Sequence, residues 1–263
     1  MEDFSRNTIK FDDGAAYEKT MGVWSQLVGS QFLDWIRPEV GKRWIDVGCG
    51  NGVFTEQIVT GYSPLEIKGI DRSDAQIEYA RGRPLTKAAG FQTGDAMDLP
   101  FKDDYFDFAM MALAIFFIPN PALGIAEMTR VVRPGGTIAA YVWDVFGGGL
   151  PLEPCHAELR EMDIKYTIPP SSNCSQMKAL EELWFKAGLQ EIKTTKITVE
   201  RAFDSFEEFW TITAGSFALI STVKNLQQAT FDQLKAAVQR RLPAGSDGRI
   251  KYTAHANAIK GLV

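Results

Sequence analysis

The stretch RWIDVGCGNGVFTEQ, residues 43–57, contains the residue types in this chain that most clearly suit ligand binding. Gly48, Gly50 and Gly52 stand at every second position, after a short apolar run and before a segment with helical character. Because glycine has no Cβ, the backbone there can adopt positive φ angles and a ligand can approach it closely. The spacing predicts a strand that breaks into a ligand-binding turn and then opens a helix. A tight strand-to-helix connection without a ligand is the alternative.

Three aspartates extend this prediction, because each stands where an expected strand ends. Asp46 precedes the glycines, Asp71 ends the run LEIKGID, and Asp95 lies in GFQTGDA. In an open parallel sheet, ligands bind outside the carboxyl ends of the strands. Asp71 has the acceptor atoms for two ribose hydroxyls, and Asp95 has an acceptor for an adenine amino group. Each alone could be an exposed strand-end or turn residue, but together they predict a nucleoside-bearing ligand.

The residues beside these landmarks narrow the choice of ligand. Arg72 and Ser73 would flank the adenine or ribose, although Ser73 also fits the N-cap of the next helix, with Gln76 three residues on. A dinucleotide-binding turn has the pattern G-x-G-x-x-G, whose third glycine lets the helix pack closely. Here Gly52 comes one place early and Val53 occupies the expected glycine position. This departure argues against a pyrophosphate, and a nucleotide-dependent oxidoreductase is kept as the alternative.

Strand and helix patterns alternate along the first half of the chain. We expect helices near 24–36, 53–60, 73–81 and 122–132, and strands at 44–47, 65–71, 90–96, from 106 through the apolar run AMMALAIFF, and at 137–143. Such alternation predicts a doubly wound α/β sheet with right-handed crossovers.

The pattern changes after Trp143. A glycine- and proline-rich insertion precedes an expected helix at 175–187, a strand at 190–203, a mostly helical segment at 204–242 and a final alternating strand at 249–263. We expect one domain over residues 1–263, in which insertions at about 146–174 and 204–242 form a cap on the substrate side. The apolar residues of 206–220 fit either the underside of that cap or core packing against the sheet edge.

Composition excludes several classes of partner and site. The chain has 263 residues, a net charge of -5, three cysteines and two histidines. The negative balance argues against nucleic acid as a partner. The cysteine spacing indicates neither a disulfide framework nor a metal site. The polar N-terminus has no secretory pattern and the longest apolar run, Ala109–Ile118, is too short for a membrane span, so we expect a cytoplasmic protein.

Four motifs in order carry a resemblance to a known family. They are WIDVGCGNGVFTEQI, KGIDRSDAQIEYAR, GDAMDLPFKDDYFDFAMMALAIFF and EMTRVVRPGGTIAAYVW. Over about residues 40–145 the chain resembles class I S-adenosylmethionine-dependent methyltransferases, in the type 11 group similar to ubiquinone and menaquinone biosynthesis methyltransferases. The resemblance implies a Rossmann-like sheet that is mostly parallel with an antiparallel last strand. It also implies S-adenosylmethionine as the cofactor and S-adenosylhomocysteine as its product.

The resemblance implies roles for residues already singled out. The methionine part of the cofactor would be held by Asp46 and the turn residues Gly48, Cys49, Gly50, Asn51 and Gly52, with Met111 and Ala112 at its amino group. The nucleoside would be held by Asp71, Arg72, Ser73, Asp95, Ala96 and Met97. Tyr17 would close over the carboxylate or else pack on the core. Phe116 stands where relatives often have His or Asn, which favours an apolar substrate pocket.

Methyl transfer from a sulfonium is an in-line displacement on an activated electrophile, so alignment can supply much of the acceleration and a general base is optional. Candidates for substrate contact or for a base are Trp143, Asp144, Glu153, Cys155 and His156. His156 would suit proton removal at its ordinary pKa, and a surface histidine is the alternative. We expect a small, partly apolar acceptor, whose identity and methylated atom the residues do not give. A non-catalytic cofactor-binding protein of the same fold is a further alternative.

Overall fold

The central sheet sets the position of every element of the fold. The computed structural model describes residues 18–216 and 218–263, so Tyr17 lies outside the described residues. The sheet has seven strands in the order β3-β2-β1-β4-β5-β7-β6. They are β1 (Arg43–Val47), β2 (Glu66–Asp71), β3 (Ala89–Thr93), β4 (Phe106–Ala112), β5 (Val132–Trp143), β6 (Gln190–Phe203) and β7 (Ile250–Leu262).

The pairing confirms the mostly parallel sheet with an antiparallel last strand. β1 pairs in parallel with both β2 and β4, and β4 pairs in parallel with β5. β7 is antiparallel to both β5 and β6, between which it lies. Strand order reverses between β1 and β4, and ligands of open α/β sheets bind at such a switch point.

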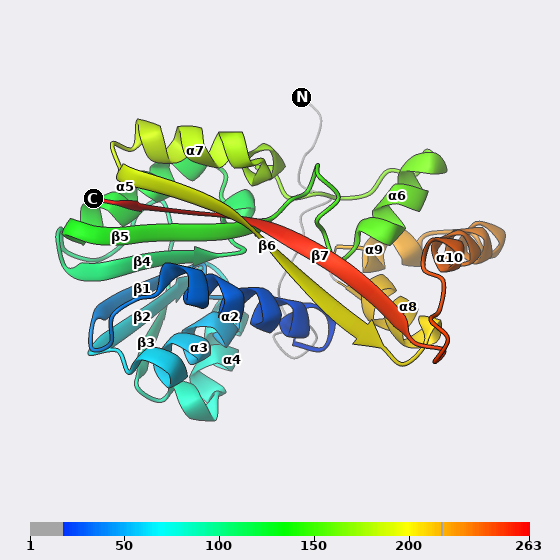
Figure 1. Cartoon of the computed structure of the whole chain (residues 1–263), viewed down its shortest axis with the longest axis horizontal. Coiled ribbons are helices and arrows are strands. Elements are labelled where there is room, and N and C mark those ends of the chain that lie inside the picture. Colours follow the sequence, from blue (N-terminus) through cyan, green and yellow to red (C-terminus); the bar gives the residue numbers. More distant parts are fainter. Residues whose placement is uncertain (1–17, 217) are drawn as a thin grey trace.

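Helices cover both faces of this sheet (Figure 1). The longer ones are α2 (Val23–Ile36), α3 (Val53–Tyr62), α4 (Asp74–Gly82), α5 (Pro121–Val131), α6 (Glu153–Glu161), α7 (Met177–Lys186), α8 (Phe206–Ala214), α9 (Ile220–Lys224) and α10 (Gln228–Arg241). Short turns of other helix types are η2 (Glu18–Gly22), η3 (Pro84–Thr86), η4 (Ile115–Phe117) and η5 (Ser172–Ser175). Helices α2, α3 and α4 lie on one face of the sheet, and α5 and α7 lie on the other.

Local chemistry explains where the helices beside the cofactor motifs begin. The Ser73 hydroxyl accepts a hydrogen bond from the Gln76 amide, so Ser73 caps α4 as expected. Asn120 caps α5 in the same way and is followed by Pro121, whose fixed φ suits the first helical position. These caps place the helix starts beside the carboxyl ends of β2 and β4.

The apolar run that follows Phe106 is not one long strand, so that expectation is wrong. β4 ends at Ala112, because Leu113 has a φ of 56° and the chain then turns into η4. Ile115 and Phe116 of the run are buried all the same. The continuous apolarity therefore reports burial over this segment rather than strand length.

The second insertion lies at the far end of a two-stranded ribbon. β6 and β7 run beyond the rest of the sheet and carry α8, α9 and α10 at that end (Figure 1). Phe206, Phe209 and Trp210 of this segment are buried and pack with the ribbon or α10, Phe209 against Phe203 and Trp210 against Phe231. Of the two alternatives for the aromatic residues of 206–220, core packing is therefore the one that the described part of the chain shows.

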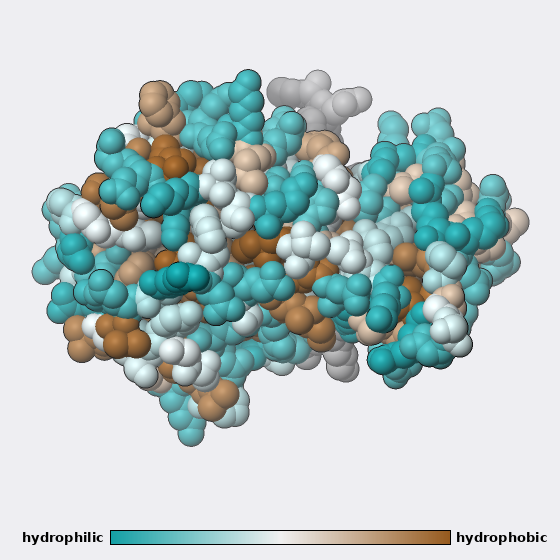
Figure 2. Space-filling model, in the orientation of Figure 1, coloured by the Kyte–Doolittle hydropathy of each residue, from teal (hydrophilic) through white to brown (hydrophobic). Residues whose placement is uncertain are grey.

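The face that carries the ribbon and α2 is mostly hydrophilic, with apolar side chains in small groups (Figure 2). Singly exposed apolar residues are ordinary on protein surfaces. No helix in residues 18–216 and 218–263 is both long and apolar enough to cross a bilayer.

Two glycines allow a matched test of the packing between β2 and β3. A Cβ at Gly69 would lie 2.6 Å from the Phe91 ring and 2.9 Å from Cys49 Sγ, whereas a Cβ at Gly61 in α3 would meet nothing within 4 Å. Gly69→Ala should therefore lower the free energy of unfolding by about 1–3 kcal/mol through overpacking. Gly61→Ala should leave it unchanged or raise it by up to about 1 kcal/mol. Urea unfolding measures both, and equal effects of the two changes would contradict the described packing.

Candidate functional site

A large cleft opens at the carboxyl ends of β1, β2 and β4. Its volume is about 1740 Å³, which exceeds the roughly 300–1,000 Å³ of a pocket for one small ligand. Most of the expected cofactor residues line it, namely Asp46, Gly48, Cys49, Gly50, Asn51, Asp71, Arg72, Ser73, Asp95, Ala96 and Ala112. The prediction that these residues share one site is thus consistent with the geometry.

The three glycines of the turn do different work. Gly48, Gly50 and Gly52 have φ angles of 74°, 51° and 81°, so all three adopt the left-handed conformation that glycine permits. A Cβ at Gly48 would overlap the side chain of Ala114, and one at Gly52 would lie 3.0 Å from Ala80 Cβ. A Cβ at Gly50 would meet nothing within 4 Å. Gly52 is absent from the cleft lining, so its hydrogen-only side chain serves helix packing.

Asp71 connects the end of β2 to the glycine turn. Its Oδ2 accepts a hydrogen bond of 2.9 Å from the Gly50 amide, and its Oδ1 accepts one of 2.9 Å from the Ser73 amide. Burial raises the pKa of this carboxyl, and the two amide bonds oppose that rise. The carboxylate therefore orders the turn and also lines the cleft, where its remaining lone pairs can accept hydrogen bonds from a ligand.

Asp46 presents a buried acceptor that the described residues leave unsatisfied. Its side chain is fully buried, and its Oδ2 accepts a 2.6 Å hydrogen bond from the Thr55 hydroxyl. Its Oδ1 has no hydrogen-bond partner within the part of the chain that the structure describes. Burial raises the pKa of this carboxyl to about 7. An unsatisfied buried acceptor in a cleft wall suits a donor or cationic group on a ligand.

The third strand end is held by its own backbone. Asp95 Oδ1 accepts a 2.9 Å hydrogen bond from the Met97 amide. Asp95 and Ala96 line the cleft, but Met97 does not. On β4, Ala112 lines the cleft while the Met111 side chain is buried in the core. Met97 and Met111 therefore do not reach the cleft with their side chains.

The three expected substrate residues lie behind the cleft wall rather than in it. Phe116 is buried against Phe117, with ring centroids 4.5 Å apart, and it is Phe117 that lines the cleft. Trp143 is buried in an edge-to-face contact with Trp24 at 6.5 Å. The η4 turn determines which of the side chains after β4 reach the cleft. A strand through this segment, as expected from the sequence, would have oriented them differently.

His156 is neither a surface residue nor a base near neutrality, so both expectations for it are wrong. It is 3% exposed and stacks on Tyr166 with ring centroids 4.3 Å apart. Burial, with a smaller contribution from the Arg160 charge, lowers its pKa to about 3. Its neighbours Glu153 and Cys155 also stay out of the cleft lining, as does Asp144. His156 instead supports Tyr166, which does line the cleft.

Sequence reasoning expected the first insertion on the substrate side but singled out none of the residues of 165–173 that line the cleft. Residues 165–170, with Ser172 and Asn173, line the cleft, and Phe146 joins them from the loop after β5. Ser171 connects this segment to the turn after β4, because its amide and hydroxyl donate to the carbonyls of Phe116 and Ile118. This segment lies inside the expected first insertion, where the run IPPSS predicted only irregular structure. Proline density marks a loop but gives no direction for its side chains.

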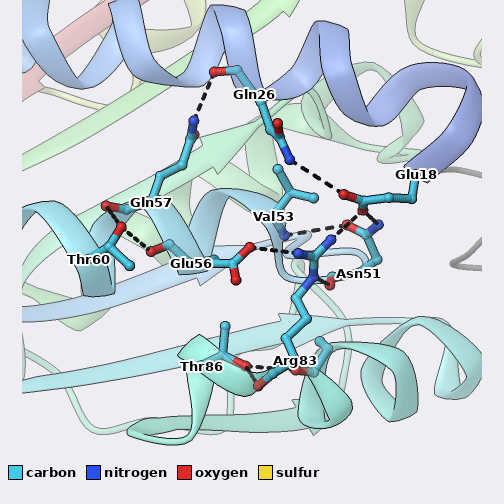
Figure 3. A network of polar contacts seen from close by, with 10 residues as sticks. Glu18, Gln26, Asn51, Val53, Glu56, Gln57, Thr60, Arg83 and Thr86 are labelled. Carbon is cyan, nitrogen blue, oxygen red and sulfur yellow. Dashed lines mark hydrogen bonds and ion pairs between the residues drawn. The ribbon is translucent and has the colours of Figure 1, made fainter.

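A charged network ties the glycine turn to the start of the described chain (Figure 3). Arg83, after α4, donates to the Asn51 carbonyl at 2.6 Å, to Glu56 of α3 at 2.6 Å, and to Glu18 of η2. The Asn51 side-chain amide also donates to Glu18 at 2.8 Å. One guanidinium thus joins four separate segments around the turn, in the multiple-donor geometry that arginine provides.

Cys49 and the metal-binding residue types contribute no reactive centre. The Cys49 thiol is buried, and burial holds its pKa well above its ordinary value, so it is not a thiolate. No group of three or more His, Cys, Asp or Glu side chains among the described residues could hold a metal ion.

Comparison with known proteins assigns this geometry to a class. A family model described as "Methyltransferase domain" matches residues 45–140. The O-methyltransferase rstn1 of Aspergillus nomiae is 31% identical over 177 residues, which are 65% of this chain and 76% of that protein. The 2-methyl-6-phytyl-1,4-hydroquinone methyltransferase 2 of Oryza sativa subsp. japonica is 42% identical over 94 residues, 36% of this chain and 27% of that protein.

A solved structure shows the same fold over nearly the whole chain. The phosphoethanolamine N-methyltransferase 2 of Haemonchus contortus, in complex with S-adenosyl-L-methionine, has a TM-score of 0.60 at 18% identity, over 98% of this chain and 58% of that one. The chain belongs to the class I S-adenosylmethionine-dependent methyltransferases. Within this class it falls in the type 11 group that the sequence motifs predicted, which decides against the oxidoreductase alternative.

The cleft fits the cofactor of this family. S-adenosylmethionine carries an ammonium, a carboxylate, a sulfonium, a ribose and an adenine, and the described lining offers carboxylates, one arginine and open backbone rather than a phosphate site. The unsatisfied Oδ1 of Asp46 matches a charged donor such as the ammonium. A Cβ at Gly50 would meet no atom of the described residues within 4 Å, so the space beside this backbone is open to a ligand.

The pH dependence of stability tests the buried state of Asp46. Its folded pKa of about 7 lies above the ordinary 3.8, so between these values the folded protein holds a proton that the unfolded chain has lost. That contribution to stability is complete below the unfolded pKa and is lost as the pH rises to about 7. Asn is neutral at every pH in this range, so Asp46→Asn should have a higher free energy of unfolding than the wild type. The difference should grow from about zero near pH 4 to at most about 4 kcal/mol above pH 7. Urea unfolding across this range measures the difference, and a constant difference would contradict the prediction.

A double-mutant cycle tests the Arg83 network. Arg83→Met leaves Glu18 and Glu56 without their cation and should lower the free energy of unfolding by about 2 kcal/mol. This is below the roughly 3–5 kcal/mol of a broken buried pair because both carboxylates are partly exposed. In the Arg83→Met background, Glu18→Gln should recover part of the loss, whereas in the wild type it should destabilise. Purely additive effects would show that the two side chains are not coupled.

Proposed function

We propose that this protein transfers a methyl group from S-adenosylmethionine to a small, partly apolar acceptor bound in the same cleft. One observation carries the proposal. The lining of the cleft of about 1740 Å³ combines carboxylates of the turn and of the segments that end β1 to β3 with mainly apolar side chains after β4 and in residues 166–170, and we call these two groups the cofactor half and the acceptor half. Two halves of different chemistry in one cleft suit a cationic cofactor and a second, apolar reactant.

The residues of the first half divide among the parts of the cofactor. Asp46 and the open backbone at Gly50 would take the methionine part, Asp71 the ribose hydroxyls, and Asp95 with the Ala96 backbone the adenine. Arg72 and Ser73 line the cleft beside Asp71 and would flank the nucleoside. Support for this division comes from the order of these residues along the sheet edge, which matches the order of groups in the cofactor.

The second half has the character of an acceptor site. Leu113, Phe117 and Ile118 after β4 line it, together with Tyr166 and Ile168 of the first insertion. Such a lining favours a ligand with an apolar body and excludes water from it. The names of the two relatives, an O-methyltransferase and a hydroquinone methyltransferase, support a small organic acceptor.

The two insertions would form a cap in two layers. The first insertion lines the cleft through residues 165–173. The second lies outside it, where Arg241 of α10 pairs with Glu158 and Glu161 of α6. In this arrangement α10 supports α6, and α6 carries His156, which stacks on the cleft residue Tyr166.

When bound, S-adenosylmethionine supplies an activated methyl group on a sulfonium. The protein contributes alignment, which for well-oriented reactants reaches effective molarities of roughly 10⁵ to 10⁸ M, or about 7–11 kcal/mol. The cofactor half, rich in carboxylates, also binds the cationic S-adenosylmethionine more favourably than S-adenosylhomocysteine, which has lost the sulfonium charge. This difference in charge favours release of the product. Without labelled product, the non-catalytic alternative would take the place of this proposal.

Ligand binding and product labelling test the proposal together. At 100 times its dissociation constant, S-adenosylhomocysteine should raise the free energy of unfolding by about 2.7 kcal/mol. Asp71→Asn, which keeps the shape of the side chain, should abolish most of this gain, and Asp98→Asn at an exposed site outside the lining should not. Labelled S-adenosylmethionine with a fractionated metabolite extract should give a labelled small molecule. Label found only in macromolecules, or stabilisation by NAD but not by S-adenosylhomocysteine, would overturn the proposal.

A further inference from the structure

Charge is distributed unevenly along the cleft. The described lining of the cofactor half contains four carboxylates, Asp46, Asp71, Asp74 and Asp95, and the cation Arg72. The described lining of the acceptor half contains one charged side chain, Lys165. A cationic cofactor explains the carboxylates. The carboxylate of the cofactor belongs to its methionine part, which the proposed division places in the cofactor half. Lys165 in the acceptor half therefore calls for a different explanation, because an apolar acceptor alone would gain nothing from it.

The acceptor half also provides no evident group to take a proton. Its described lining includes no Asp, Glu, His or Cys side chain: it consists of residues 112–114 and 117–119, Tyr141, Phe146, residues 165–170, Ser172 and Asn173. His156 lies behind Tyr166 with a pKa of about 3, and the Tyr166 hydroxyl accepts a 3.0 Å hydrogen bond from Arg160. A nucleophile that needed a base would find none among these side chains. The acceptor is therefore best served by being ionised before it binds.

Lys165 is available to such an acceptor. Its side chain is exposed, and it forms no ion pair or hydrogen bond with any residue in the described ranges. It lies next to Tyr166 in the segment that closes the cleft. An ammonium on a flexible stem can pair with an anion that enters from the mouth, and such a charge-assisted hydrogen bond is stronger than a neutral one.

Two apolar side chains share the cleft lining with Lys165 and are exposed to solvent, so we describe them as the mouth of the cleft. Phe146 is 55% exposed and Ile168 is 40% exposed, and both line the cleft. Burial of such side chains by a ligand is favourable in proportion to the apolar area covered. The mouth thus suits a hydrocarbon chain or ring system that extends outward from the charged group.

We propose that the methyl acceptor is an apolar acid, an oxyanion that is ionised at neutral pH on a hydrocarbon body, and that Lys165 pairs with it. This inference rests on the proposed methyltransferase function. In the reaction, a lone pair of the acceptor oxygen forms the new O–C bond while the C–S bond of the sulfonium breaks. The electron pair of that bond stays on sulfur, the product is a neutral methyl ester or enol ether, and no proton is transferred. Lys165 orients the anion by contact with it and takes no part in bond breaking.

Two matched probe pairs test the charge preference by isothermal titration calorimetry on the full chain with saturating S-adenosylhomocysteine. Octanoate is compared with octanamide, and 4-hydroxycoumarin, an enol ionised at neutral pH, with coumarin. The acid of at least one pair should bind about tenfold more tightly than its neutral partner, as expected for about 1.4 kcal/mol of ionic interaction. A preference for octanoate alone identifies a carboxylate acceptor, and a preference for the enol alone identifies an acidic enol or phenol.

The variants place this preference at Lys165. Lys165→Met should remove it while S-adenosylhomocysteine still binds, and Lys165→Arg should restore it. Lys178→Met removes the same charge from an exposed position on α7 outside the cleft lining and should preserve it. Equal binding of acids and neutral partners, no binding of either acid, or an unchanged preference in Lys165→Met would overturn the inference. Failure of the wild type to bind S-adenosylhomocysteine would instead overturn the proposed function.

Discussion

The hydrogen bonds from the Gly50 and Ser73 amides to Asp71 are the interaction on which the site depends. They join the carboxyl end of β2 to the turn after β1, so that neighbouring strand ends become one binding surface. The cost of burying a carboxylate there is offset by backbone donors rather than by a cation, because the nearest cation, Arg72, is exposed. The cleft consequently keeps its negative charge for a ligand instead of neutralising it internally.

Much of the cofactor site follows from sequence because it is built from short-range patterns. A strand, a glycine turn with Asp46 before it, and an acidic residue at the next strand end can each be recognised from neighbours in the chain. Their assembly then follows from the rule that parallel strands end at one sheet edge. The exceptions are also local in cause. The single left-handed residue Leu113 ends β4 early, so that Phe117 rather than Phe116 faces the cleft.

The acceptor side could not be predicted in the same way, because its geometry depends on contacts between distant parts of the chain. His156 is buried through Tyr166, ten positions on, and its helix rests on α10, more than seventy positions on. Periodicity within a segment carries no record of such contacts. The two alternatives for His156, a base and a surface histidine, both failed for this reason. The residues that do line this side were hidden in a proline-rich run without a recognisable pattern.

The β6–β7 ribbon separates what the sheet does from what the insertions do. The ribbon carries α8, α9 and α10 away from the strand ends that hold the proposed cofactor residues (Figure 1), and of the two insertions only the first contributes residues to the described cleft lining. Under the proposed function, side chains of the first insertion can change while the strand ends keep their carboxylates, so donor use and acceptor choice can diverge at different rates during evolution. A lineage of such proteins can thus acquire new acceptors while retaining one methyl donor.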